Sequence, residues 1–192
     1  MSNIFITSDT HFGHIGVTQF LKEDGTKLRP WDNYEEMDEA MVANWNSVVS
    51  PKDKVYHLGD VVINRRAFPT LARLNGEKVL IKGNHDIFQL KEYLPYFKDI
   101  RAYHPLDGFL MTHIPVHPDS LSRWKGNWHG HLHDKGVMHK YVQDCEFDES
   151  FTVISEIDPR YMCLSVEHTN FTPISLEDAK KKFELQQGEC ID

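Results

Sequence analysis

Residues 54–84 read KVYHLGDVVINRRAFPTLARLNGEKVLIKGN, and this stretch contains the alternation on which the fold prediction depends. Residues 54–58 form an apolar run that ends in Gly59-Asp60, residues 78–81 form a second run, and residues 66–74 between them favour a helix. Short apolar runs that alternate with helical segments predict a mainly parallel sheet covered by helices. In such sheets, ligands bind where loops leave the carboxyl ends of the strands.

The same pattern continues on both sides of this stretch. Residues 4–7 form an apolar run that ends in Ser8-Asp9, and apolar residues recur at helical spacing from Met37 to Val48. Further strands are expected at residues 109–112, 128–133, 151–154 and 161–166. Ser175, with Asp178 three residues later, predicts a capping box that opens a last helix, which runs to about residue 186.

The composition predicts one cytoplasmic domain. A chain of 192 residues, 40% hydrophobic and 26% charged, is sized for a single domain over residues 1–192. Cys145, Cys163 and Cys190 are odd in number and lack CxxC spacing, which favours a reducing compartment over a disulfide framework. Because there is no run of about 18 apolar residues and no basic, apolar leader before Asp9, we expect neither secretion nor membrane insertion.

The charge and the histidines indicate what the chain binds. A net charge of −8 opposes stable binding to a nucleic-acid duplex, because that binding depends on many Lys and Arg contacts to phosphates. Twelve histidines is a high number, and five of them lie between residues 113 and 133. That grouping favours a metal site.

Five short polar blocks each follow an apolar, strand-like run. They are Asp9-Thr10-His11, Gly59-Asp60, Gly83-Asn84-His85-Asp86, Thr112-His113 and Gly130-His131-Leu132-His133. Imidazole and carboxylate ligands suit Mn²⁺, Fe and Zn²⁺, and a shared carboxylate, here Asp60, can hold two such ions together. If Asp9 and Asp60 are the only anionic ligands, two divalent ions leave a charge of about +2, which attracts a phosphate ester.

In this order the blocks resemble the signature of the calcineurin-like metallophosphoesterase superfamily: D-x-H, G-D, G-N-H-[DE], H and G-H-x-H. The match extends from Asp9 to His133. The segments around His14, residues 29–31 and residues 44–46 are similar to a compact microbial and bacteriophage-type branch. The resemblance implies an α/β (α+β) fold, a four-layer sandwich of two mixed β-sheets flanked by helices.

The resemblance also implies a role for each residue of the blocks. Asp60 would bridge two divalent metal ions, with Mn²⁺ favoured and Fe, Zn²⁺ or Ni²⁺ as alternatives. Asp9, His11 and His133 would complete one site, and Asn84, His113 and His131 the other. A metal-bound hydroxide would attack phosphorus in line, His85 would protonate the leaving alkoxide, and Asp86 would orient His85.

Other polar residues have a structural interpretation beside a functional one. His57 lies inside a strand-like run and is expected to be a hydrogen-bonded core histidine. His14 fits a substrate contact and an ordinary loop residue equally well. For Arg29, a phosphate-binding fork competes with an exposed charge on a packed stem, and the second is preferred. Either His117 or His129 is expected to orient a ligand imidazole without binding metal.

Two basic or aromatic groups are interpreted in the same way. Lys180-Lys181-Lys182 falls late in the last predicted helix, where a solvated face is preferred over a nucleic-acid patch. Trp124 and Trp128, with Arg123 and Lys125, suit either a base-stacking rim or packing, and packing is preferred.

The leading functional hypothesis is a phosphodiesterase that acts on small or nucleotide-like phosphate esters. A phosphomonoesterase is the first alternative; it would need further cations, for which Arg29 and His14 are the candidates. A nuclease comes next and is disfavoured by the charge. A non-catalytic metal-binding scaffold comes last, because the ligand set is complete and His85 is present. No membrane partner is expected, and the oligomeric state stays open.

Overall fold

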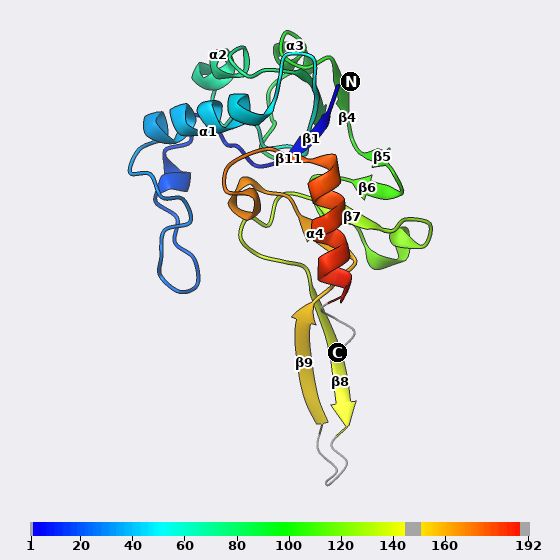
Figure 1. Ribbon diagram of the computed structural model, residues 1–192. Coiled ribbons are helices and arrows are strands. Elements are labelled where there is room, and N and C mark those ends of the chain that lie inside the picture. The colour runs from blue at the N-terminus through cyan, green and yellow to red at the C-terminus, as the bar shows by residue number, and fades with distance from the viewer. Residues whose placement is uncertain (1, 145–150, 189–192) are drawn as a thin grey trace.

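The computed structural model describes residues 2–144 and 151–188 (Figure 1). Its strands are β1 (Ile4–Thr7), β2 (Lys54–His57), β3 (Glu77–Ile81), β4 (Asp99–Arg101), β5 (His104–Leu106), β6 (Phe109–Met111), β7 (Gly126–His129), β8 (Met138–Asp144), β9 (Phe151–Ile157), β10 (Tyr161–Cys163) and β11 (Ile174–Ser175). Its helices are α1 (Tyr34–Val48), α2 (Phe68–Leu71), α3 (Leu90–Tyr93) and α4 (Leu176–Gly188), with 3-10 turns η1 (Gly16–Thr18), η2 (Arg65–Ala67), η3 (Pro118–Leu121) and η4 (Val166–Thr169).

Two mixed sheets organise the molecule. The first has the order β11-β1-β2-β3-β4, in which β1 to β4 are parallel and β11 is antiparallel. The second has the order β10-β7-β6-β5, in which only β5 is antiparallel to its neighbour. The expected architecture of two mixed β-sheets with helices is therefore confirmed, including the parallel pairing of the strands in residues 54–84.

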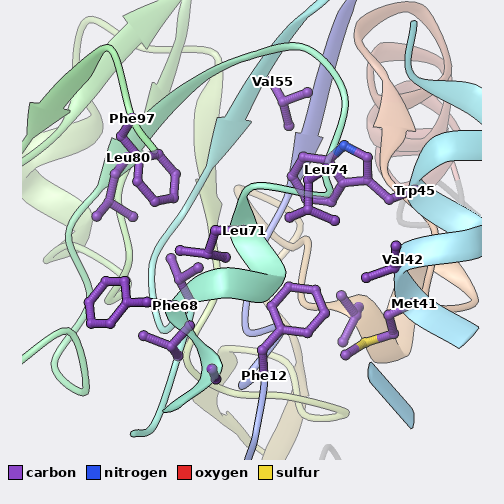
Figure 2. Packing of buried hydrophobic residues seen from close by; sticks show 14 of the residues in the cluster. Phe12, Met41, Val42, Trp45, Val55, Phe68, Leu71, Leu74, Leu80 and Phe97 are labelled. Carbon is purple, nitrogen blue, oxygen red and sulfur yellow. The ribbon is translucent and has the colours of Figure 1, made fainter. Parts of the chain in front are cut away.

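The core forms two layers because successive residues of a strand face opposite sides of the sheet. On one side of the first sheet, Phe5 and Leu80 pack with α1 and α2, whose buried residues include Trp45 and Leu71 (Figure 2). On the other side, Ile6 and its neighbours pack against the second sheet. Helix α1 begins where Asn33 accepts a hydrogen bond from the backbone N–H of Glu36 at 2.8 Å.

Helix α4 and η3 cover the second sheet. Phe183 of α4 packs between the sheets, with its ring centroid 4.9 Å from that of Phe109. Trp128 is fully buried and stacks on Phe109 at 4.0 Å, so the packing interpretation of Trp128 is confirmed. On the outer face of the sheet, Leu110 packs with Leu121 of η3 and with the half-buried Trp124.

The expected helix over residues 66–74 is shorter than predicted. Pro69 lies in the first turn of α2, where its missing N–H costs no hydrogen bond, and residues 65–67 form the separate turn η2. The helix ends at Leu71. Downstream, Gly76 adopts a φ of +88°, a conformation that turns the chain into β3.

The strands expected late in the sequence also differ in extent. The strand predicted over residues 128–133 ends at His129, because His131 and His133 adopt left-handed backbone conformations that no strand continues. The strand expected at residues 151–154 extends to Ile157, but it pairs with β8 in a two-stranded ribbon outside both sheets (Figure 1). The last helix follows Ser175, whose hydroxyl accepts from the Asp178 N–H at 3.1 Å as predicted.

The structure describes one of the three cysteines and most of the chain in which a membrane span was not expected. Cys163 is a buried free thiol, and burial raises its pKa to about 11, whereas Cys145 and Cys190 lie outside the described residues. Across residues 2–144 and 151–188, no helix has both the length and the apolar composition that a bilayer crossing requires.

His57 is a core histidine, as predicted. Its Nε2 lies 3.0 Å from the Thr10 hydroxyl and its Nδ1 accepts from the Gly59 N–H at 3.2 Å. Burial lowers the pKa of His57 to about 3, so the folded chain keeps this ring neutral while the unfolded chain protonates it near pH 6.5. Stability linked to His57 is therefore present above pH 6.5 and is lost as the pH falls toward 3.

This linkage predicts a pH-dependent effect of His57→Gln. Between pH 7.5 and 5.0, the native chain should lose up to about 2 kcal/mol of unfolding free energy through His57. The variant should lose correspondingly less. Urea unfolding of chelator-treated protein at both pH values measures the difference, and His139→Gln, at an exposed position of β8, is the control. Parallel pH profiles for the native chain and His57→Gln would contradict the prediction.

Candidate metal centre

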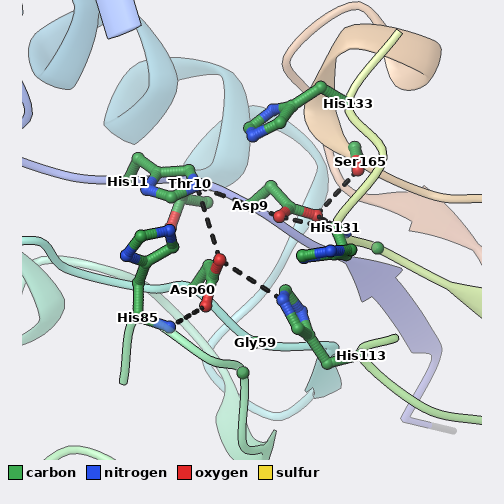
Figure 3. Close-up of polar contacts among 12 residues, drawn as sticks. Asp9, Thr10, His11, Gly59, Asp60, His85, His113, His131, His133 and Ser165 are labelled. Carbon is green, nitrogen blue, oxygen red and sulfur yellow. Dashed lines mark hydrogen bonds and ion pairs between the residues drawn. The ribbon is translucent and has the colours of Figure 1, made fainter. Parts of the chain in front are cut away.

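The polar blocks converge at the carboxyl ends of strands from both sheets, as the sequence predicts (Figure 3). From the first sheet, Asp9 and His11 follow β1, Asp60 follows β2, and Asn84 follows β3. From the second sheet, His113 follows β6, and His131 and His133 follow β7. The site therefore depends on the relative placement of the two sheets.

The backbone at the site is strained in a consistent way. Asp9, His11, Asp60, His131 and His133 all have φ between 50° and 71°. A non-glycine residue in this region costs about 1–3 kcal/mol and is found where the surrounding structure over-determines it, often at functional sites. Each side chain is thereby turned out of its strand direction and toward the other sheet.

Glycine is required between β2 and Asp60. Gly59 has a φ of +104°, and a Cβ at this position would lie 2.6 Å from the backbone nitrogen of Gly83. The close approach brings the loop after β2 against the loop after β3. It explains why glycines precede Asp60 and Asn84 in the sequence blocks.

Six of the side chains form two groups of three, and within each group the ligand atoms all lie within 4.8 Å of one another. The first cluster comprises Asp9, His11 and His133; the second cluster comprises Asp60, His113 and His131. One carboxylate oxygen lies between them: Oδ2 of Asp60 is 3.3 Å from His113 Nε2 and 3.7 Å from His11 Nε2. This is the geometry that a shared carboxylate between two ions requires.

Asn84 contacts the second cluster. Its Oδ1 lies 2.8 Å from His113 Nε2 and 2.9 Å from His131 Nδ1. One amide oxygen and two imidazole nitrogens thus point to a common position, which is the ligand set that the resemblance implies for the second ion.

The donor set fits divalent metal ions. Both ring nitrogens of His11 are buried and find no hydrogen-bond partner within the described residues, although a buried polar atom is normally satisfied. Burial, assisted by the Arg29 charge, holds the pKa of His11 well below its usual value, so the ring is neutral and has a lone pair to donate. Imidazole, carboxylate and amide donors suit Mn²⁺, Fe or Zn²⁺.

The two carboxylates are held by hydrogen bonds from neighbouring loops. Asp9 accepts from the Ser165 hydroxyl at 2.7 Å and from the His131 N–H at 3.0 and 3.1 Å. Asp60 accepts from the His85 N–H through Oδ1 at 2.8 Å, which leaves Oδ2 directed at the histidines. Preorganised ligands lose less entropy when an ion binds.

His85 is exposed beside the clusters, with its ring centroid 5.6 Å from that of His11 (Figure 3). Asp86 is fully buried and accepts from the N–H groups of Asp60, Val61 and Gly83 at 2.8–3.0 Å. Its carboxylate therefore fixes the loops that carry Asp60 and His85. The hydrogen bonds of Asp86 within the described residues go to these backbone groups and not to the His85 imidazole, so its expected role in orienting His85 stays a prediction.

Arg29 is a buried structural residue, which corrects both interpretations made from the sequence. Its side chain is 0% exposed, and its guanidinium donates to the carbonyl oxygens of Asp9 at 2.6 Å and Thr10 at 2.9 Å. The same group pairs with Glu167 Oε1, at 2.9 Å from Nε and 2.8 Å from Nη2. Arg29 thus fixes the loop that carries Asp9, and no donor is left for a substrate.

Sequence reasoning missed Glu167, as it missed Ser165. Glu167 lies in η4, and its Oε1 is 3.1 Å from Nδ1 of the ligand candidate His133. Burial alone would raise the pKa of Glu167, but the Arg29 charge and the His133 hydrogen bond lower it to about 2. A carboxylate in this position fixes the tautomer and orientation of the imidazole.

Glu167→Gln is expected to weaken metal binding by about 10- to 100-fold, because the amide holds the His133 ring in place less well than a carboxylate does. The variant keeps an acceptor for Arg29, so the fold should be retained. Metal stoichiometry under chelator competition measures the effect, and Glu177→Gln on the exposed face of α4 is the matched control. Unchanged affinity in Glu167→Gln would show that His133 needs no such support.

The remaining histidine expectations divide. His14 is brought to the site: its ring centroid is 5.5 Å from that of His11, and its role toward substrate stays a prediction. His117 is 74% exposed and caps η3, so it orients no ligand. The buried His129 lies 2.8 Å from the Gly130 carbonyl through Nδ1 and supports the backbone before His131 rather than a ligand ring.

The lysines late in the chain lie on α4 as expected. Lys180 pairs with Asp107, Lys181 lies 3.5 Å from Asp178, and Lys182 donates to the His168 carbonyl at 2.8 Å. These local partners fit a solvated helix face.

Sequence and structure comparisons place the chain among known proteins. Residues 2–164 match the family described as calcineurin-like phosphoesterase. An uncharacterized protein of Methanocaldococcus jannaschii is 32% identical over 92% of this chain and 89% of its own length. The gene 66 protein of Mycobacterium phage L5 is 34% identical over 74% of this chain and 83% of its own length.

A solved structure supports the same fold. The crystal structure of a protein of unknown function from Aquifex aeolicus aligns with a TM-score of 0.59 and 22% identity, covering 94% of this chain and 99% of that one. Archaeal and phage relatives are consistent with a compact microbial and bacteriophage-type branch. With the family match over most of the sequence and two clusters of metal-ligand type, the chain belongs to the calcineurin-like phosphoesterase family.

Proposed function

We propose that the chain is a phosphodiesterase that hydrolyses small or nucleotide-like phosphate esters with two divalent metal ions. The observation that carries this proposal is the exposed His85 imidazole beside two clusters that share the Asp60 carboxylate. A two-metal centre and a nearby proton donor are the parts that ester hydrolysis at phosphorus needs.

The residues divide the work of the reaction. The first cluster would hold one ion, and the second cluster together with Asn84 would hold the other. Asp60, a member of the second cluster, would contact both ions. The ions, when bound, neutralise charge on the phosphate and activate a water molecule. His85 protonates the leaving oxygen at its position beside the clusters, and the Asp60 carboxylate holds the His85 backbone N–H at 2.8 Å.

The burial of Arg29 supports the diester preference, because it removes a cation that could bind a phosphate. A phosphomonoester is a dianion and needs more positive charge around its terminal oxygens than a diester does. The guanidinium of Arg29 pairs with Glu167 and donates to two backbone carbonyls. Arg29 is therefore not available to a monoester, and burial lowers the pKa of His14, the other cation considered from the sequence.

Related proposals concern metal, location and partners. We propose Mn²⁺ as the working ion, with Fe, Zn²⁺ and Ni²⁺ as alternatives, because this donor set suits all four. We also propose a cytoplasmic location, which the free Cys163 thiol and the cysteine spacing support. The substrate is a small ester rather than duplex nucleic acid, because the net charge is −8.

The test compares bis-p-nitrophenyl phosphate with p-nitrophenyl phosphate. Chelator-stripped protein is restored with Mn²⁺, Ni²⁺, Fe²⁺ or Zn²⁺ separately, and kcat/KM is measured for both esters. Faster diester hydrolysis with at least one metal is the expected result. Faster monoester hydrolysis would replace the proposal with a phosphatase, and stoichiometric metal binding without hydrolysis of any ester would favour the scaffold.

A further inference from the structure

A cavity of about 670 Å³ opens beside the second cluster. Asn84 and His113 belong to its lining, together with residues of the loops after β4 and β6 and of the segment around η3. Ligand pockets typically measure about 300–1,000 Å³, so the space suits an organic group of nucleoside size. Its contact with Asn84 and His113 places that group next to the phosphate position.

The walls of the cavity are aromatic and apolar. Trp124 is half-buried against Leu110, and Tyr103 is 60% exposed. Ile114 and Val116 complete the apolar lining. Aromatic rings with a free face bind planar groups by stacking, which every nucleobase can provide.

The part of the lining around Thr112 and Val116 is fixed by hydrogen bonds within the protein. The Asn127 side chain is fully buried; its Oδ1 accepts from the Val116 N–H at 3.1 Å, and its Nδ2 donates to the Thr112 hydroxyl at 2.9 Å. The Tyr161 hydroxyl donates to the Val116 carbonyl at 2.8 Å. A wall held in this way needs little ordering on binding.

Two cations line the same cavity. Lys82 and Arg123 are exposed, and neither forms an ion pair with a carboxylate within residues 2–144 and 151–188. A guanidinium and an ammonium together favour an anionic group such as a phosphate.

We infer that this cavity binds the organic substituent of the ester, and that this substituent is a nucleoside with a further negatively charged group. The base stacks against Trp124 and Tyr103, and the additional anion lies at Lys82 and Arg123. This inference rests on the proposed function, because it names the substrate class of that same site. It also gives Trp124 a role in binding, whereas the sequence analysis preferred packing.

The experiment measures equilibrium binding to Mn²⁺-loaded protein by calorimetry. The probes are ribose 5-phosphate, adenosine 5′-monophosphate and adenosine 3′,5′-bisphosphate, which add first a base and then a second phosphate. We expect a tenfold or greater gain in affinity for the base, since stacking against one aromatic residue provides about that much. A further gain is expected for the second phosphate.

Variants assign each gain to its residues. Trp124→Ala and Tyr103→Ala should reduce the ratio of monophosphate to ribose 5-phosphate affinities by about tenfold. Tyr103 is mostly exposed, so Tyr103→Ala tests the inference even if Trp124→Ala fails to fold. Tyr141→Ala, on the remote β8–β9 ribbon, is the matched control. Lys82→Ala and Arg123→Ala should reduce only the gain from the second phosphate, with Lys52→Ala as control.

The outcomes separate this inference from the proposed function. Equal affinities for ribose 5-phosphate and the monophosphate, in protein that hydrolyses diesters, would overturn the nucleoside pocket and leave the phosphodiesterase intact. A base-dependent gain that Tyr103→Ala leaves unchanged would also overturn the pocket. A base-dependent gain that Tyr103→Ala abolishes, in protein that hydrolyses no ester, would support the pocket and refute the function.

Discussion

Asp60→Asn is expected to abolish metal occupancy and activity together. Its Oδ2 lies within 3.7 Å of a ring nitrogen in both His11 and His113, so this carboxylate is placed to serve two ions. An amide has no negative charge to share between cations. Loss of the shared ligand should lower kcat/KM by about a thousandfold or more, and metal analysis should find fewer than two ions per chain.

The asparagine keeps an oxygen that can accept from the His85 N–H, as Oδ1 of Asp60 does. A loss of metal would therefore not be caused by disruption of the loop that carries His85. Asp60→Ala should give the same result with a larger cost in stability. Asp119→Ala, at a position 93% exposed, is the control for removal of an aspartate. Two tightly bound ions in folded Asp60→Asn would disprove the shared-ligand assignment.

The first sheet was predictable because the sequence marks where its main strands end. Residues 4–7, 54–58 and 78–81 are short apolar runs, followed by Ser8-Asp9, by Gly59-Asp60 and, after Lys82, by Gly83-Asn84. Parallel strands buried on both faces read as continuous apolar runs, so β1, β2 and β3 gave strong signals. Strands β4 and β5 have only three residues each and carry too few apolar positions to be recognised.

The ribbon and the short helix α2 required tertiary information. β8 and β9 pair outside both sheets, and none of the side chains at residues 153–157 is fully buried, so the sequence pattern there does not identify a core-facing side. The length of α2 depends on how the turn after Leu71 meets α1, where Asn46 donates to the Arg73 carbonyl at 2.9 Å. Neither contact is visible in local sequence.

The ligand candidates were predictable and their support was not, for a similar reason. Each ligand block is local, with two or more informative residues within four positions. Arg29 and Glu167 act as a pair separated by 138 positions, and neither residue has a local pattern that indicates burial. A buried ion pair at a metal site is defined only when the fold brings its partners together.

The second large effect is expected for His85→Ala, which should keep both metal ions and lose turnover. The exposed His85 imidazole belongs to neither cluster of ligand candidates. Asp60 accepts a hydrogen bond from the His85 backbone N–H and not from its ring. Removal of a general acid typically lowers the rate by about 10²–10⁴-fold. The loss should be largest for alkyl diesters, whose alkoxide must be protonated as it leaves.

Esters with a p-nitrophenolate leaving group need little protonation, so His85→Ala should slow their hydrolysis far less than that of alkyl diesters. The ratio of the two losses, measured as kcat/KM, separates proton donation from substrate binding, because a binding defect would lower kcat/KM for both esters alike. His117→Ala, which removes an exposed histidine from η3, is the matched control. Equal losses on both esters, or the loss of an ion from His85→Ala, would remove His85 from the role of proton donor and assign it to substrate or metal binding.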